Sequence, residues 1–161
     1  MILLTVGTQL PFDRLVRAVD SIALQLEESI FGQIGEGNYV PKNFEYCRLS
    51  TPSEMMELFQ SATRIVSHAG TGSLLTARRF GKPIVIFPRR AAFGEHRNDH
   101  QLATCEHVGS KAGVEVAYDE AELHRILEAL RPPEMHGPVD EERNSQLGGN
   151  IYNYIKHGRV L

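Results

Sequence analysis

The sequence has little cysteine and no long apolar run. Its two cysteines, Cys47 and Cys105, are far apart and match no metal-binding spacing, which indicates reduced, structural thiols in a reducing compartment. No stretch approaches the roughly 20 apolar residues that a membrane-spanning helix needs. The residues that follow Met1 have neither the basic region nor the length of a signal peptide. We therefore expect a cytoplasmic protein.

Charge is unevenly distributed along the chain. Its 161 residues carry a net charge of −3 and are 42% hydrophobic, which suits one domain with a real core. Between residues 76 and 100, cations outnumber the two anions, Glu95 and Asp99. This basic segment favours a local anion, such as phosphate or a membrane headgroup, over general nucleic-acid binding. An ordinary solvated surface is the alternative. The cations are Arg78, Arg79, Lys82, Arg89, Arg90 and Arg97.

Short apolar runs alternate with amphipathic segments. The runs predict strands and the segments of helical spacing predict helices. No internal repeat or low-complexity tract interrupts them. We expect strands at residues 2–6, 30–34, 44–49, 64–67, 84–87 and 114–116, and helices at residues 12–28, 52–59, 73–80, 98–107 and 119–130.

This alternation predicts an α/β domain over residues 1–131, with a doubly wound, mostly parallel sheet and helices on both faces. Ligands of such sheets bind at the carboxyl ends of the strands. Pro132 and Pro133 break the pattern. For residues 132–161 we expect a linker and a C-terminal helix that packs on the same domain; docking on a partner or a membrane is the alternative.

A glycine-rich turn lies between the strand at 64–67 and the helix that follows. Residues 67–73 read Ser-His-Ala-Gly-Thr-Gly-Ser. Glycines allow close approach of a ligand, and a helix start offers free N–H groups and a favourable dipole to phosphate. The turn predicts an anion site, although it is neither a phosphate loop nor a full dinucleotide fingerprint. A purely structural turn is the alternative.

A second polar cluster, residues 95–101 (Glu-His-Arg-Asn-Asp-His-Gln), starts the helix after the next strand. It should lie on the same rim of the sheet as the glycine turn. His96 and His100 are four residues apart and could ligate a metal together with His68 or Glu95, but a cation between them opposes this. We expect no metal. Thr8, after the first strand, either faces the same crevice or belongs to a simple turn.

Four motifs in this order carry a family resemblance. They are Gly-Thr-Gln at residues 7–9, the glycine turn, Gly-Lys-Pro at 81–83 and Asn-Asp-His-Gln at 98–101. Together they resemble the C-terminal, donor-binding domain of glycosyltransferase family 28. The resemblance covers residues 1–131 and is closest to single-domain members, which include a subunit of the dolichol-linked N-acetylglucosaminyltransferase and short bacterial exopolysaccharide proteins.

The resemblance implies a Rossmann-like half of a GT-B fold that binds a UDP-sugar and requires no cofactor or metal. Thr76 departs from the family, several members of which carry a ribose-binding glutamate there. Candidate catalytic residues are His68 and Glu95. Arg89, Arg90 and Arg97 are candidates for leaving-group stabilisation. The expected diphosphate-binding residues are Gly70, Thr71, Gly72, Ser73, His68 and Thr8, and those for sugar and ribose are Gln101, His100, Asn98, Glu95 and Thr76.

The resemblance also implies a partner. In two-domain relatives the acceptor site lies in the other domain, so we expect a membrane-anchored partner subunit that brings a lipid-linked saccharide. The chain would then be an inverting sugar transferase subunit of polysaccharide biosynthesis, recruited to the cytosolic membrane face and nearly inactive alone. The alternatives are a non-catalytic regulatory subunit and a UDP-sugar epimerase or hydrolase.

Overall fold

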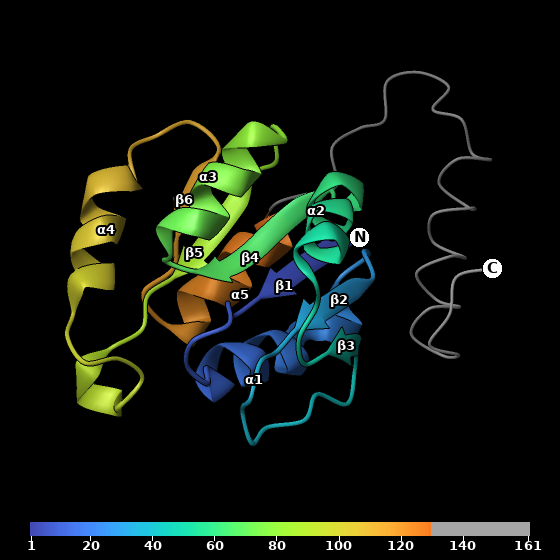
Figure 1. The fold of residues 1–161 in the computed structure, drawn as a ribbon, viewed down its shortest axis with the longest axis horizontal. Helices are drawn as coiled ribbons and strands as arrows, with labels where there is room; N and C mark the ends of the chain where they lie inside the picture. The colour runs from blue at the N-terminus through green and yellow to red at the C-terminus, as the bar shows by residue number, and fades with distance from the viewer. Residues whose placement is uncertain (130–161) are drawn as a thin grey trace. The chain divides into compact units, whose positions relative to one another are not determined.

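The computed structural model describes residues 1–129, which belong to one compact unit. Its centre is a six-stranded sheet in the order β3-β2-β1-β4-β5-β6 (Figure 1). All five strand pairings are parallel, which confirms the predicted doubly wound sheet. The strands are β1 (Ile2–Thr5), β2 (Ile30–Gln33), β3 (Glu45–Cys47), β4 (Arg64–His68), β5 (Ile84–Phe87) and β6 (Val114–Val116).

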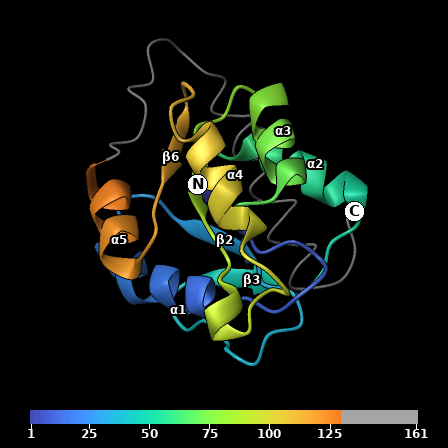
Figure 2. The same cartoon turned by 90° about the vertical axis from the view of Figure 1, so that its left-hand side faces the viewer.

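Helices cover both faces of the sheet, as predicted. Helices α1 and α5 lie together on one face, and α2, α3 and α4 lie on the other (Figure 2). Right-handed crossovers produce this division, because the chain moves in opposite directions from the centre of the sheet in its two halves. The helices are α1 (Asp13–Ile22), α2 (Pro52–Ser61), α3 (Thr71–Arg79), α4 (His100–Val108) and α5 (Glu120–Ala129), with 3-10 turns at Ala23–Gln25 and Ala91–Phe93.

Local chemistry explains where the helices begin. At α2 the Thr51 side chain accepts from the Glu54 N–H, the Glu54 carboxylate accepts from the Thr51 N–H, and Pro52 occupies the first turn. This capping box is the start signal that the sequence carries. Helix α4 begins at His100 rather than at residue 98, because the Asn98 side chain accepts from the His100 N–H and occupies the helix start.

One predicted helix is too long. Helix α1 ends at Ile22, a 3-10 turn follows at Ala23–Gln25, and residues 26–28 of the predicted helix are not helical. The apolar periodicity continues past Ile22, but Leu24 is 80% exposed, so burial no longer holds the chain in a helix there.

The main core lies between the sheet and the α1/α5 layer. It contains Leu15, Val19 and Ile22 of α1, and Leu123 and Leu127 of α5, all at most 1% exposed. Within residues 1–129 no helix is long and apolar enough to span a membrane. The predicted linker and C-terminal helix at 132–161 lie outside the described residues.

Candidate functional site

A cavity of about 440 Å³ opens where β1, β4 and β5 end. Five segments line it, each following or facing the carboxyl end of a strand, as a parallel sheet predicts. They are the β1–α1 loop from Gly7 to Leu10, Gln33 of β2, Met55 and Phe59 of α2, the β4–α3 turn from His68 to Ser73 with Thr76, and the β5–α4 region with Arg89, His96, His100, Gln101 and Thr104.

The start of α3 gives the cavity an anion-binding wall. Gly70 is its N-cap, no side chain caps the helix, and its first turn holds no acidic residue. The backbone N–H groups of Thr71, Gly72 and Ser73 therefore have no acceptor within the helix, and the helix dipole adds a partial positive charge. Because these residues line the cavity, the wall is suited to a phosphate group.

The imidazole of His68 lies between two glycine backbones. A Cβ atom at Gly7 would lie 2.8 Å from Cε1 of the ring, and one at Gly70 would overlap Nε2. Gly7 also has a φ of +76°, which disfavours any other residue. Both glycines are thus required by the position of His68, and the turn is shaped around this side chain.

His68 is neutral at physiological pH. Burial and the nearby Arg89 cation lower its pKa from 6.5 to about 4, against a hydrogen bond with the Thr5 backbone that raises it. The Ser67 hydroxyl lies 3.3 Å from Nδ1. A neutral imidazole beside an anion site can donate a hydrogen bond to a phosphate oxygen, whereas a pKa this low makes it a weak general base.

Arg89 is a structural cation that joins two loops of the site. Its guanidinium donates to the carbonyls of Val6 (2.9 Å), Leu10 (2.7 Å) and Pro11, and it stacks 4.5 Å from the Phe12 ring centroid. Its backbone N–H donates to Oε1 of Gln101 at 3.0 Å. This bond orients the Gln101 amide, whose NH₂ group makes no hydrogen bond within the described part of the chain.

Glu95 forms an ion pair at the base of the β5–α4 loop. Its carboxylate forms a two-pronged ion pair with Arg14, at 2.7 and 2.8 Å, and accepts from the Arg90 N–H at 2.9 Å. It is absent from the cavity lining. In this arrangement the carboxylate holds the β5–α4 loop, and a role in ribose binding or as a base stays a prediction.

Three further predicted residues also lie outside the cavity lining. Arg90 donates to the Tyr118 carbonyl at 2.8 Å, Arg97 is exposed to solvent, and Asn98 hydrogen-bonds the His100 backbone and lies beside its ring. The contacts of Arg90 and Asn98 therefore lie outside the cavity lining. The other predicted residues line it: Thr8, His68, Gly70, Thr71, Gly72, Ser73, Thr76, Arg89, His100 and Gln101.

The structure also adds residues that sequence reasoning missed. Met55 and Phe59, one turn apart on α2, form an apolar wall, although their spacing suggested only a core-facing side. Gln33 is 1% exposed and donates to the Gly7 and Arg48 carbonyls while accepting from Thr5. A polar residue at the end of an apolar strand was the available signal for it.

Among residues 1–129 no group of three or more His, Cys, Asp or Glu side chains is arranged to hold a metal ion. His96 and His100 do come together, with ring centroids 4.4 Å apart in an edge-to-face contact, and both line the cavity. Residues that line the cavity include no Asp or Glu. The electrostatics of the site come from Arg89 and the start of α3, and both favour an anionic ligand.

Fold and site together define a Rossmann-like α/β domain with a cavity at the carboxyl ends of its strands and an uncapped helix start in its lining. A model of the glycosyltransferase family 28 C-terminal domain matches residues 1–156, and the chain belongs to that family.

Two curated relatives are similar to parts of the chain. The UDP-N-acetylglucosamine transferase subunit ALG13 of Mus musculus is 34% identical over 104 residues, 58% of this chain and 9% of the mouse protein. The L-demethylnoviosyl transferase of Streptomyces niveus is 28% identical over 148 residues, 84% of this chain and 35% of that protein. The chain thus corresponds to a minor part of either relative.

Solved structures share the fold. The glycotransferase of kitacinnamycin superimposes with a TM-score of 0.60 at 17% identity, over 99% of this chain and 40% of that one. Spinosyn forosaminyltransferase SpnP gives 0.55 at 17% identity, over 98% and 40%. The chain therefore shares its fold with about 40% of the length of these larger enzymes.

The contact between His68 and Gly70 can be tested by a mutant cycle. We expect Gly70→Ala to lower the free energy of unfolding by about 1–3 kcal/mol, because the new methyl group overlaps the ring. The same change in a His68→Ala background should cost less than about 0.5 kcal/mol. Urea unfolding measures both. Gly72→Ala is the control, since its Cβ meets nothing within 4 Å; equal losses at Gly70 and Gly72 would contradict the assignment.

The lowered pKa of His68 predicts that the free energy of unfolding depends on pH. The unfolded chain protonates His68 below about pH 6.5 and the folded chain only near pH 4, so its neutral form contributes full stability above pH 6.5. That contribution is lost as the pH falls towards 4. Between pH 7.5 and 4.5 we expect wild type to lose about 2 kcal/mol more than His68→Asn in urea unfolding. Parallel pH profiles of the two proteins would disprove the lowered pKa.

A second cycle separates a positioning role of Glu95 from a catalytic one. Arg14→Gln and Glu95→Gln should each cost about 1–3 kcal/mol of stability, and the double variant little more than either, because they break the same ion pair. Stability, UDP affinity and sugar transfer with the partner present are measured for all three. A Glu95→Gln variant that is stable and inactive, beside a fully active Arg14→Gln variant, would instead identify Glu95 as a catalytic residue.

Proposed function

We propose that this chain is the donor-binding half of an inverting glycosyltransferase that uses a UDP-sugar. The observation that carries the proposal is the uncapped start of α3, which lines a cavity free of carboxylates beside a neutral histidine. Family membership supports a transferase, and the name of the mouse relative, a UDP-N-acetylglucosamine transferase subunit, supports a UDP-sugar donor.

In this proposal the diphosphate binds the backbone N–H groups of Thr71, Gly72 and Ser73, with a hydrogen bond from neutral His68. The nucleoside lies against the apolar wall of Met55 and Phe59, near Thr76. The Thr76 hydroxyl already donates to the Gly72 carbonyl at 2.8 Å, so it offers the ribose an acceptor rather than a free donor. The sugar extends towards Gln101 and His100 on the opposite side of the cavity.

The transfer step requires little covalent chemistry from this half. An acceptor hydroxyl attacks the anomeric carbon, the bond to the β-phosphate oxygen breaks, and UDP leaves with the bonding electrons. The negative charge that grows on UDP is stabilised by the α3 start and by the buried charge of Arg89, without a metal ion. Arg89 acts at a distance, since its guanidinium is bonded to backbone carbonyls.

The proton of the acceptor hydroxyl must go elsewhere. The cavity lining lacks a carboxylate, and His68 is a weak base. A partner that carries the acceptor site and the base accounts for this, and the word "subunit" in the name of the mouse relative supports an assembly. We propose a membrane-anchored partner that presents a lipid-linked saccharide, which would recruit this chain to the cytosolic membrane face for polysaccharide synthesis.

Calorimetric titration with UDP and a panel of UDP-sugars tests the donor site. We expect binding that is unchanged by chelators, because the proposed site uses N–H donors instead of a metal. Gly72→Asp should lower the affinity at least about 100-fold, since it places a carboxylate against the diphosphate. Gly72→Ala is the matched control and should bind nearly as wild type. Equal affinity of wild type and Gly72→Asp would disprove this placement.

Activity assays separate the proposal from its rivals. Co-expression with the candidate membrane partner should give sugar transfer to a lipid-linked acceptor, whereas the chain alone should give almost none. A non-catalytic regulatory subunit would bind the donor, but Gly72→Asp would not change the rate of sugar transfer by the assembly. An epimerase or hydrolase would convert the free UDP-sugar without any partner.

A further inference from the structure

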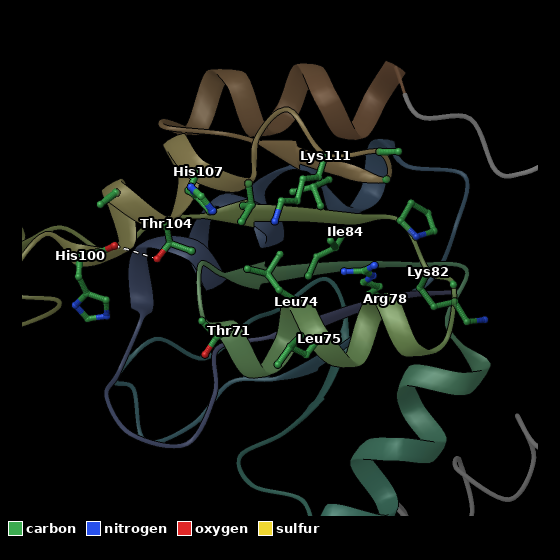
Figure 3. A pocket seen from close by; sticks show the side chains of 17 residues that line it. Thr71, Leu74, Leu75, Arg78, Lys82, Ile84, His100, Thr104, His107 and Lys111 are labelled. Atoms are coloured by element: carbon green, nitrogen blue, oxygen red, sulfur yellow. Dashed lines mark hydrogen bonds between the residues drawn. The ribbon is translucent and has the colours of Figure 1, made fainter.

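The cavity of about 440 Å³ that we propose to bind the donor is called the donor cavity from here on. A second hollow lies outside it. It has a volume of about 1280 Å³ and runs between α3 and α4 over the starts of β5 and β6 (Figure 3). Ile84 and Leu74 lie near its middle, and Thr71 and His100 lie at the end nearest the donor cavity. We call it the α3/α4 groove.

The two helices that border the groove are poorly buried. Helix α3 buries only Ala77, and α4 buries only Gln101 and Cys105, whereas α1 on the opposite face buries six residues. Leu75 of α3 is 67% exposed and lines the groove. Helices that cover a sheet normally bury a full apolar stripe, so among residues 1–129 the outer side of α3 and α4 lacks cover.

The groove is also cationic. Of its 17 lining residues, three are lysine or arginine, namely Arg78, Lys82 and Lys111, and none is acidic. Arg78 and Lys82 lie at the end away from His100, and Lys111 lies nearer the middle (Figure 3). The ammonium group of Lys82 is partly buried, and this burial lowers its pKa. These features stand out in a chain of net charge −3.

We propose that the α3/α4 groove is the docking site for an acidic amphipathic helix of a partner protein. An apolar floor between two helices fits the helix-in-groove mode of recognition, in which the apolar face enters and charged flanks pair with the rim. The nine residues of α3 extend about 13 Å, enough for between two and three turns of a docked helix. A concave groove does not fit the flat surface of a bilayer.

The α3/α4 groove is a different site from the donor cavity, but the two are adjacent. Thr71, His100 and Thr104 line both the groove and the donor cavity. A helix in the groove would therefore lie beside the bound donor. The charged groups tested below, Arg78 and Lys111, do not line the donor cavity, so the two sites can be perturbed independently.

Designed peptides test the proposal. The probe is a fluorescein-labelled amphipathic helix of about 15 residues, with leucines on one face and glutamates on its flanks. A matched peptide carries lysine in place of every glutamate. By fluorescence anisotropy on the full chain, we expect the acidic peptide to bind at least about tenfold more tightly than the basic one. The double variant Arg78→Glu/Lys111→Glu should reverse this preference.

Controls make either result informative. Arg79→Glu changes a neighbouring arginine that does not line the groove and should leave peptide binding unchanged. All variants should keep the UDP affinity of wild type, which reports a folded chain and an intact donor site. Equal binding of both peptides, or equal loss in Arg79→Glu, overturns the proposal. So does Arg78-dependent binding to phosphatidylcholine–phosphatidylglycerol vesicles without peptide binding, which would assign the surface to a membrane.

Discussion

The site depends on the position of one side chain, the imidazole of His68 between the backbones of Gly7 and Gly70. This contact brings the end of β1 to the start of α3, two segments that adjacent parallel strands place on the same rim. No other residue type at either glycine would leave room for the ring. Arg89 then joins the β1–α1 loop to the β5–α4 segment through backbone carbonyls. The cavity that we propose to bind the donor is the space that these contacts leave open.

The same contacts determine the electrostatics. A buried guanidinium whose hydrogen bonds go to carbonyl oxygens keeps its positive charge beside the cavity, and it helps to keep His68 neutral. The start of α3 adds N–H donors, and the one carboxylate of the β5–α4 loop close to Arg89 is engaged by Arg14. An anion therefore meets donors and positive potential without a competing carboxylate, which is what a diphosphate requires in the absence of a metal.

Much of the fold and part of the candidate site could be predicted from the sequence. Alternating strands and helices predicted the parallel sheet, and the glycine turn predicted a helix start that lines the cavity, because both depend on local pattern. The roles of Glu95 and Arg90 could not be predicted. The partner of Glu95 is Arg14, 81 residues away, and Arg90 reaches Tyr118, so only the tertiary structure shows that these charges are engaged. The apolar wall of Met55 and Phe59 was hidden for a related reason, since spacing alone does not distinguish a core face from a ligand face.

The most direct test of the account is a crystal structure of the chain with bound UDP. We predict that the β-phosphate lies within hydrogen-bonding distance of the backbone N–H groups at the start of α3, with His68 donating to it and Arg89 still bonded to the β1–α1 loop. A diphosphate bound elsewhere, or held by Arg90 or Arg97 after rearrangement of the β5–α4 loop, would contradict the account.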